Sequence, residues 1–200
     1  MGARAILFDL GGVLLPFDRD RRIAAIVRQL GVGPAAARAF MAAAIHGRLD
    51  RGEADEADLA EAFSDLAGRP VASREAQDLM LSVFEAPNAA LWALVEDLRH
   101  RLTVGGFSDN PAWVCRVFPP GAVLDPIIWS SELGLTKASP AAFAAVQARL
   151  GLPPDSILFV DDTLANIEQA RRMGWDGIVF VSNDQLAAEL SARGLPRGLR

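Results

Sequence analysis

The sequence predicts an α/β protein, with a Rossmann-like parallel sheet as its core and an all-helical cap inserted after the first strand. Two observations predict this fold. Short apolar runs alternate with amphipathic helical segments from Leu102 onward, which is typical of βαβ units and hence of a parallel sheet. The first apolar run, Ala5 to Phe8, is followed instead by a long stretch that carries helical patterns and no convincing strand.

The core elements follow one another as strand and helix. The continuous apolar character of Ala5 to Phe8 favours a strand that is buried on both faces. Asn88 can cap a helix whose apolar positions recur along one face. The expected strands are 5–8, 102–107, 127–129, 157–160 and 177–181, and the expected core helices are 89–100, 111–117, 139–150, 163–173 and 184–193.

The inserted segment has the pattern of four helices separated by breaks rich in glycine and proline. Pro34 suits the first turn of a helix, and the alanine-rich stretch 35–44 favours helix by propensity. The helices are expected at 18–30, 34–46, 54–67 and 73–84, with one of the breaks at Gly47 to Gly52. We therefore expect a core domain formed by residues 1–15 and 87–200, and a helical cap domain formed by residues 16–86.

The composition argues against several classes of protein. The 200 residues are 51% hydrophobic and 22% charged, which is enough to bury a core without disulfides. The formal charge of -5 predicts no nucleic-acid partner, and the short, interrupted apolar stretches predict no membrane partner. The single cysteine, Cys115, and the lack of a signal-peptide pattern after Met1 favour the cytoplasm. Cys115 lies in an apolar helical stretch and is expected in the core. The composition does not distinguish a monomer from a homodimer.

Ligands of open parallel sheets bind beyond the carboxyl ends of the strands. The polar side chains expected there each follow a predicted strand, directly or a few residues on. They are Asp9, Ser108, Asp109, Lys137, Asp161 and Asp162. Lys137 is the only lysine among 20 basic residues, which indicates either a need for a compact ammonium at this position or the chance survival of one lysine.

Carboxylates that share one crevice raise each other's pKa unless a cation joins them. Mg²⁺ suits such a crevice, because it takes one or two carboxylates together with substrate phosphate. Phosphoryl transfer also needs a nucleophile, and Asp9 can be both nucleophile and metal ligand. Lys137 can neutralise the charge of the phosphate and of Asp9, while Ser108 can bind a phosphate oxygen. The residues therefore favour phosphoryl chemistry that depends on Mg²⁺.

Four sequence motifs carry a resemblance to a known family. They are AILFDLGGVLL, GFSDN, SSELGLTKASPAAF and ILFVDDTLANIEQARRMG, in that order. Together they resemble the haloacid dehalogenase-like (HAD) hydrolase superfamily over essentially the whole chain, including the helical cap after the first motif. The forms FDLGGVLL and VDDTLANIEQA most resemble its sugar-phosphatase branch, in particular bacterial α-D-glucose-1-phosphate phosphatases.

The resemblance implies a role for each motif residue. Asp9 would be the nucleophile that forms an aspartyl-phosphate. Asp9, the backbone carbonyl of Gly11 and Asp162 would bind Mg²⁺, and Asp161 would hold the waters of the metal or ligate it directly. The implied phosphate-binding side chains are those of Ser108 and Lys137. Asn166 would shape the last loop rather than take part in chemistry.

Two positions depart from the pattern of the family. Gly11 stands where most of its phosphatases place a second Asp as general acid and base, a contribution worth about 10²–10⁴-fold. A sugar 1-phosphate would need less protonation, because its anomeric hydroxyl is comparatively acidic. Asp109, a candidate substrate-binding residue, stands where the branch usually has Asn. Asp109 could replace the missing acid, but we expect its charge to point into solvent.

The resemblance thus implies a phosphate monoester hydrolase that acts on a small phosphorylated metabolite, with a sugar phosphate as one candidate. A 2-haloacid dehalogenase is the first alternative, because it uses the same Asp nucleophile without a metal. Its last motif does not usually offer an Asp pair, so Asp161 and Asp162 favour the phosphatase. The second alternative is a catalytically weak binding protein that kept the fold, and the presence of every other motif residue speaks against it.

Overall fold

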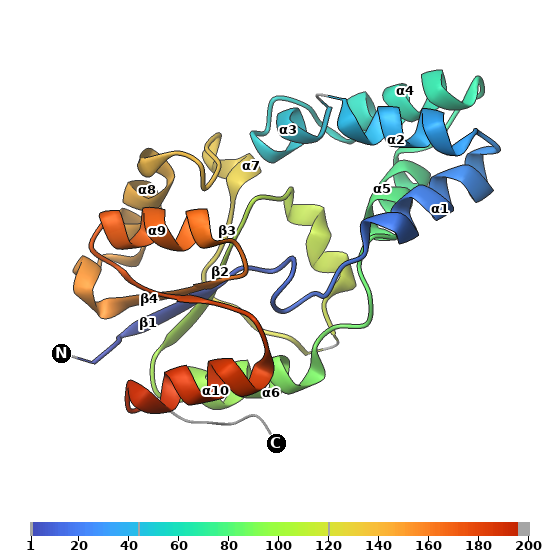
Figure 1. Ribbon diagram of the computed structural model, residues 1–200. Coiled ribbons are helices and arrows are strands. Elements are labelled where there is room, and N and C mark those ends of the chain that lie inside the picture. The colour runs from blue at the N-terminus through green and yellow to red at the C-terminus, as the bar shows by residue number, and fades with distance from the viewer. Residues whose placement is uncertain (1, 44, 120, 196–200) are drawn as a thin grey trace.

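The computed structural model describes residues 2–43, 45–119 and 121–195 and has a five-stranded, fully parallel sheet at its centre (Figure 1). The strand order is β3-β2-β1-β4-β5, so the first strand lies in the middle. Phe8 is level with Gly106 of β2 on one side and with Val160 of β4 on the other. The strands are β1 (Ala5–Phe8), β2 (Thr103–Ser108), β3 (Ile127–Trp129), β4 (Ile157–Asp161) and β5 (Asp176–Val179). The predicted α/β fold class is confirmed.

Helices cover both faces of this sheet (Figure 1). Successive side chains of a strand point to opposite faces, and β1 divides its apolar residues accordingly. Ile6 and Phe8 pack with α6 (Ala89–Arg99) and α10 (Asn183–Ala192) on one face. Leu7 packs on the other face with α8 (Pro140–Leu150) and α9 (Leu164–Arg172). The continuous apolar run in the sequence therefore reflects burial on two sides.

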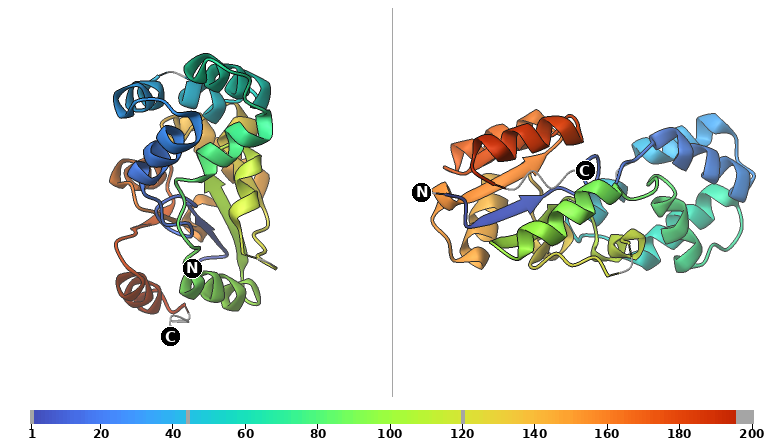
Figure 2. Two further views of the ribbon diagram at one scale, coloured as in Figure 1. Left: turned by 90° about the vertical axis from the view of Figure 1, so that its right-hand side faces the viewer. Right: turned by 90° about the horizontal axis from the view of Figure 1, so that it is seen from below.

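The chain between β1 and β2 begins with a separate group of helices, and Figure 2 shows this group beyond the end of the sheet toward which β1 runs. The helices bury a hydrophobic cluster of their own, in which Ile26, Leu59 and Phe63 lie at the centre. They are α1 (Arg19–Leu30), α2 (Pro34–Ala42), α3 (Ile45–Asp50), α4 (Glu56–Ala67) and α5 (Ser73–Leu81). None of the helices in the described part of the chain is both long and apolar enough to cross a membrane.

Local sequence signals explain where several of these helices begin and end. Asp18 caps α1 by accepting a hydrogen bond from the backbone amide of Asp20, and the helix ends at Gly31 in the left-handed region. Asp55 and Asp58 form a reciprocal capping box at the start of α4. These are surface signals that a single sequence displays, so the helices at both ends of the group fell close to their expected ranges.

The structure corrects the sequence prediction at two places. The helix expected over 34–46 ends at Ala42, and α3 occupies 45–50, where a break was expected. Cys115 was expected in the core, but it lies exposed on the 3-10 helix η1 (Ala112–Val117). The remaining short elements are α7 (Ser130–Leu133) and the 3-10 helix η2 (Pro154–Ser156).

Two chain segments connect the helical group to the sheet, and they run side by side. The backbone amide of Asp18 donates to the carbonyl of Val83 at 2.8 Å, and that of Glu85 donates to the carbonyl of Pro16 at 2.8 Å. Phe17 and Phe84 form an antiparallel bridge between these bonds. This pairing fixes where the helices stand relative to the carboxyl end of β1.

Gly105 and Gly106 are adjacent in β2, an inner strand of the sheet, and offer a matched test of packing. A Cβ on Gly105 would lie 2.4 Å from the carbonyl oxygen of Pro126 and 2.8 Å from Leu7 Cδ2, whereas one on Gly106 would meet nothing closer than 3.4 Å. We expect Gly105→Ala to lower the free energy of unfolding by about 1–3 kcal/mol. Gly106→Ala should change it little, and urea unfolding of both variants measures the difference. Equal losses in the two variants would contradict the close approach at Gly105.

Candidate functional site

A buried ammonium lies between two carboxylates at the carboxyl end of the sheet. Lys137 Nζ is 2.7 Å from Asp9 Oδ1 and 2.8 Å from Asp161 Oδ2. The side chain of Lys137 is only 2% exposed, and that of Asp161 is fully buried. Asp9 follows β1 and Asp161 ends β4, which are neighbouring strands, so the parallel pairing alone brings the two carboxylates together. The structure thus brings Asp9, Lys137 and Asp161 together at one edge of the sheet.

Lys137 reaches this position because its loop and its side chain are both held. Its backbone amide donates to the two carboxylate oxygens of Asp109, at 3.0 and 3.2 Å. Its Nζ lies 5.7 Å from the ring centroid of Phe107 and 5.4 Å from that of Phe159. A slender side chain can pass between core rings and still deliver a compact charge, which a planar guanidinium would not match.

The position of Asp109 corrects an expectation from the sequence. Its carboxylate does not point into solvent but is half-buried, and it anchors the loop that carries Lys137. Burial raises the pKa of the Asp109 carboxyl, while the nearby Lys137 charge lowers it. The departure from the family pattern at this position therefore has a structural role.

Asp161 is fully engaged by its neighbours. The Thr163 amide donates to Oδ1 at 2.8 Å, and Asn166 Nδ2 lies 3.1 Å from both oxygens. With Lys137 on Oδ2, each carboxylate oxygen has two donors. Asn166 therefore holds the last loop in place through Asp161, and Asp161 in turn orients Lys137.

Burial and charge act together on the pKa values of the triplet formed by Asp9, Lys137 and Asp161. Burial raises the pKa of Asp9, the Lys137 charge lowers it and the Asp161 charge raises it again, so the pKa of Asp9 stays above its usual value. Burial by itself would lower the pKa of Lys137, but the carboxylates of Asp9, Asp161 and Asp109 outweigh it and raise that pKa. Lys137 is therefore a permanent cation next to Asp9.

Asp9, Asp161 and Asp162 form an acidic group at the same place. One carboxylate oxygen of each lies within 4.8 Å of the other two. The backbone of Gly12 leaves room for the Asp162 carboxylate. The φ of Gly12 is +81°, and a Cβ at this position would lie 2.2 Å from Asp162 Oδ2. Only glycine combines that backbone conformation with so close an approach. Three hard oxygen donors in one crevice are chemically suited to a hard divalent cation.

A cleft of about 350 Å³ opens over this group. Asp9, Gly11, Lys137 and Asp162 line its floor, and helix α1 contributes Arg19 and Arg22 to its wall. Ser108 does not join these lining residues. It is fully buried, and its hydroxyl accepts a hydrogen bond from Asn110 Nδ2 at 3.0 Å.

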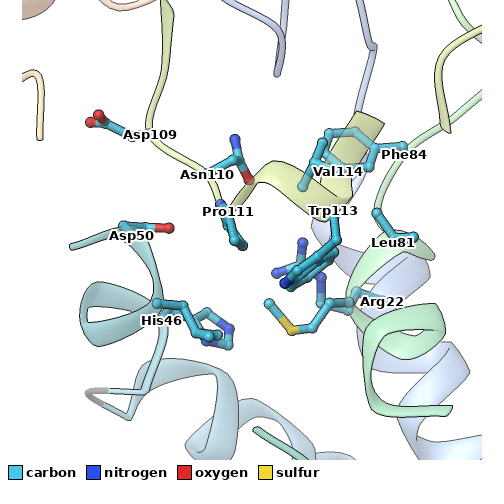
Figure 3. A pocket seen from close by; sticks show the side chains of 12 residues that line it. Arg22, His46, Asp50, Leu81, Phe84, Asp109, Asn110, Pro111, Trp113 and Val114 are labelled. Atoms are coloured by element: carbon cyan, nitrogen blue, oxygen red, sulfur yellow. The ribbon is translucent and has the colours of Figure 1, made fainter. Parts of the chain in front are cut away.

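A smaller cavity of about 150 Å³ adjoins the cleft (Figure 3). The two spaces share Arg22, Phe84, Asp109 and Asn110 as lining residues. The rest of the cavity is lined from the helical group and from η1. Those residues are His46, Leu49, Asp50, Met80, Leu81, Pro111, Trp113 and Val114.

His46 and Asp50 are functional candidates that the sequence did not reveal. They are four residues apart on α3, so they lie on one face of that helix. The expected break at 47–52 concealed this spacing, and His46 was assigned no role. With α3 assigned correctly, the spacing is a readable signal.

Two ionisable groups of the cavity, His46 and Asp50, have shifted pKa values. Burial raises the pKa of Asp50 to about 7, and the Asp109 charge adds to the rise, while Arg22 and Arg51 oppose it. Burial and the Arg22 charge lower the pKa of His46 to about 4. At neutral pH His46 is therefore uncharged.

Comparison with known proteins matches residues 3–174 to the model for haloacid dehalogenase-like hydrolases. A D-ribitol-5-phosphate phosphatase of Bacteroides thetaiotaomicron is 27% identical over 183 residues, which cover 86% of this chain and 88% of that protein.

Two solved structures share the fold. A HAD family enzyme of the same organism, in complex with magnesium and inorganic phosphate, has a TM-score of 0.77 and 22% identity over 88% of this chain and 93% of that one. L-2-haloacid dehalogenase of Xanthobacter autotrophicus has a TM-score of 0.62 and 21% identity over 95% and 83%.

Asp50→Asn tests the electrostatics of the cavity. A carboxyl whose pKa is raised from 3.8 to about 7 in the folded protein costs stability that grows as the pH rises from about 4 to about 7. We therefore expect Asp50→Asn to be more stable than the parent at pH 8, with the advantage at pH 8 exceeding that at pH 5 by about 1–2 kcal/mol.

Urea unfolding at the two pH values measures this difference. Asp65→Asn, at an exposed position of α4, is the matched control and should behave like the parent at both. An advantage of Asp50→Asn that does not change with pH would rule out the raised pKa.

Proposed function

Because the chain belongs to the haloacid dehalogenase-like hydrolase family, we propose that it is a Mg²⁺-dependent phosphate monoester hydrolase. It acts on a small phosphorylated metabolite through an aspartyl-phosphate on Asp9. The observation that carries this proposal is the acidic group of Asp9, Asp161 and Asp162 next to the Lys137 ammonium. A site that binds a metal ion and a phosphate next to a nucleophile needs both the acidic group and the ammonium. A dehalogenase needs no metal ion and therefore no group of three carboxylates.

Asp9, Asp162 and the carbonyl of Gly11 would hold the Mg²⁺. Asp162 is partly exposed beside the cleft, and Gly12 leaves room for it. Asp161 is assigned to Lys137, since each of its oxygens already accepts two hydrogen bonds. When bound, the metal would neutralise phosphate charge and orient the phosphoryl group.

The chemical step begins with attack of an Asp9 oxygen on phosphorus. The ester P–O bond breaks, and the leaving oxygen takes the electron pair and a proton from water in the cleft, because Gly11 supplies no acid. A second water then hydrolyses the aspartyl-phosphate, which releases inorganic phosphate and restores Asp9. Lys137 remains beside Asp9 in both steps and stabilises the negative charge on the phosphoryl oxygens. Asp109 holds the loop that carries Lys137, and the buried Ser108 accepts a hydrogen bond from Asn110 within the turn after β2.

Residues 16–86 serve as the cap, and residues 1–15 and 87–200 form the catalytic core. Arg19 and Arg22 of α1 reach the wall of the cleft, so the cap takes part in the site rather than only covering it. The name of the Bacteroides thetaiotaomicron relative supports a sugar-alcohol or sugar phosphate as the substrate class. The narrower likeness to α-D-glucose-1-phosphate phosphatases stays a prediction.

Asp9→Asn should abolish hydrolysis of p-nitrophenyl phosphate, because the amide is no longer a nucleophile. The parent should lose its activity in EDTA and regain it with Mg²⁺. We expect a fall of at least about 10³-fold in kcat for Asp9→Asn. Release of p-nitrophenolate measures both effects, and Asp65→Asn serves as the unaffected control.

The same preparation should be incubated with 2-chloropropionate in EDTA. If chloride is released without metal and no phosphate ester is hydrolysed, the protein is a dehalogenase rather than a phosphatase. Turnover of neither compound by folded protein would favour the binding protein.

Mg²⁺ binding can be measured without catalysis. A ligand that binds only the folded state raises the unfolding temperature, and the rise grows with the logarithm of its concentration over Kd. We expect millimolar Mg²⁺ to raise the unfolding temperature of the parent by a few degrees, and that of Asp162→Asn by less than half as much. Asp155→Asn, in η2 away from the cleft, is the matched control. The same rise in all three proteins would argue against Asp162 as a ligand.

A further inference from the structure

We propose that the 150 Å³ cavity beside the cleft binds the leaving group of the substrate, and that this group is a short, uncharged, polyhydroxylated carbon chain, as in a sugar-alcohol or small sugar phosphate. This inference rests on the proposed phosphatase and assigns the cavity residues of the cap, His46 and Asp50, to recognition of the substrate. Arg22, which lines both spaces, is assigned to the same role.

The position of the cavity defines what can occupy it. It shares four lining residues with the cleft that contains Asp9, so a group esterified to a phosphate over Asp9 extends directly into it. Figure 3 shows His46 and Asp50 on the helical side of the cavity, facing Asp109, Asn110 and Pro111 of the core. The occupant is therefore enclosed by both parts of the chain.

Two polar atoms of this wall are buried and unsatisfied. Arg22 Nε and His46 Nδ1 have no hydrogen-bond partner among the residues that the structure describes. Each such atom destabilises the free protein, because it has lost its hydrogen bonds to water and gained none in exchange. The proximity of two of them, from α1 and α3, indicates that a ligand completes their hydrogen bonding.

The hydrogen-bonding character of the wall fits hydroxyl groups. The Arg22 guanidinium is a donor only, and Asp50 as a carboxylate is an acceptor only. His46 Nε2 lies 3.2 Å from the Met41 sulfur, and with the ring proton on that nitrogen, Nδ1 is an acceptor. A hydroxyl both donates and accepts, so adjacent hydroxyls on a carbon chain can satisfy all three groups. Trp113 supplies the apolar wall that the C–H groups of such a chain need.

The charge of the cavity selects against an acidic leaving group. At pH 7 Arg22 contributes one positive charge and His46 none, while Asp109 and the ionised fraction of Asp50, whose pKa is about 7, contribute negative charge. A carboxylate would meet repulsion from Asp50 and Asp109, whereas a neutral chain of hydroxyls meets none. The cavity therefore favours a neutral polyol over a phosphorylated acid.

The size of the cavity sets a second limit. A space of about 150 Å³ accommodates a compact group of roughly six to ten non-hydrogen atoms, since a cavity of that volume takes up benzene. A nucleoside has about twice that number of atoms and would not fit. A pentitol such as ribitol, with about ten non-hydrogen atoms, is within the limit, and a hexose, with about twelve, is slightly above it.

The first experiment compares substrates. The wild-type protein with Mg²⁺ is assayed on D-ribitol 5-phosphate, α-D-glucose 1-phosphate, 3-phosphoglycerate, AMP and p-nitrophenyl phosphate. We expect kcat/KM for at least one of the two sugar phosphates to exceed those for 3-phosphoglycerate and AMP by tenfold or more. A preference for 3-phosphoglycerate or AMP would overturn the proposal.

The second experiment compares variants. In Asp50→Asn, kcat/KM for the preferred sugar phosphate should fall at least tenfold relative to that for p-nitrophenyl phosphate, with the loss mainly in KM. His46→Phe keeps an aromatic ring without a polar atom and should shift the same ratio. Asp65→Asn is the control, with no change in the ratio. Because Asp50→Asn is expected to be more stable than the parent at pH 8, a loss there cannot come from unfolding. An equal loss on both substrates would overturn the proposal.

A binding measurement separates this inference from the proposed function. Asp9→Asn protein is titrated with D-ribitol 5-phosphate by calorimetry, alone and in combination with Asp50→Asn. Binding that weakens at least tenfold in the double variant supports the cavity, and binding that is unchanged contradicts it. If no ester is hydrolysed by the parent, the proposed function fails, and this titration still decides whether the cavity recognises a polyol.

Discussion

The site depends on one interaction, the burial of the Lys137 ammonium between Asp9 and Asp161. Removing three charged groups from water carries a penalty of several kcal/mol per ion, and only close geometry with further hydrogen bonds offsets it. The fold supplies that geometry in two ways. β1 and β4 pair directly, so their carboxyl ends place the two carboxylates side by side. Asn166 and the Thr163 amide satisfy Asp161, which leaves Asp9 as the carboxylate of the triplet that lines the cleft.

The sequence predicted this centre because its position follows from topology. Residues that end neighbouring parallel strands must meet at one edge of the sheet, so Asp9 and Asp161 could be placed together from strand assignments alone. The cavity could not be placed in this way. Its polar groups Arg22, His46 and Asp50 come from α1 and α3, whose packing depends on long-range contacts rather than on a repeating pattern. The prediction that the Asp109 carboxylate points into solvent was wrong for a related reason. Its partner is a backbone amide 28 residues away, and no pattern of side chains in the sequence predicts such a hydrogen bond.

The two parts of the site also differ in how they are stabilised. The charged centre lies against the sheet, where each buried charge has partners. The cavity retains an unpaired Arg22 Nε, an unpaired His46 Nδ1 and the strained carboxyl of Asp50. Functional sites commonly keep such costs in the free protein, since the ligand relieves them. The paired connections at Asp18–Val83 and Pro16–Glu85 hold the helical group next to the sheet, where the cavity shares lining residues with the cleft over Asp9.

In the reaction and the substrate complex proposed above, Gly11 and the cavity would affect different kinetic constants. Without an acid at Gly11, the rate of P–O cleavage should depend strongly on how readily the leaving oxygen accepts charge, and this dependence enters kcat. The cavity contacts hydroxyls remote from phosphorus, so its binding energy enters KM unless it strengthens in the transition state. An anomeric phosphate should have the higher kcat, because its leaving oxygen is more acidic, while a short open-chain polyol phosphate should have the lower KM, because it fits the cavity. Leaving-group acidity and hydroxyl pattern should therefore rank a series of sugar phosphates in different orders for kcat and for KM. A side chain that restored an acid at position 11 should reduce the differences in kcat among these substrates and leave their order in KM unchanged.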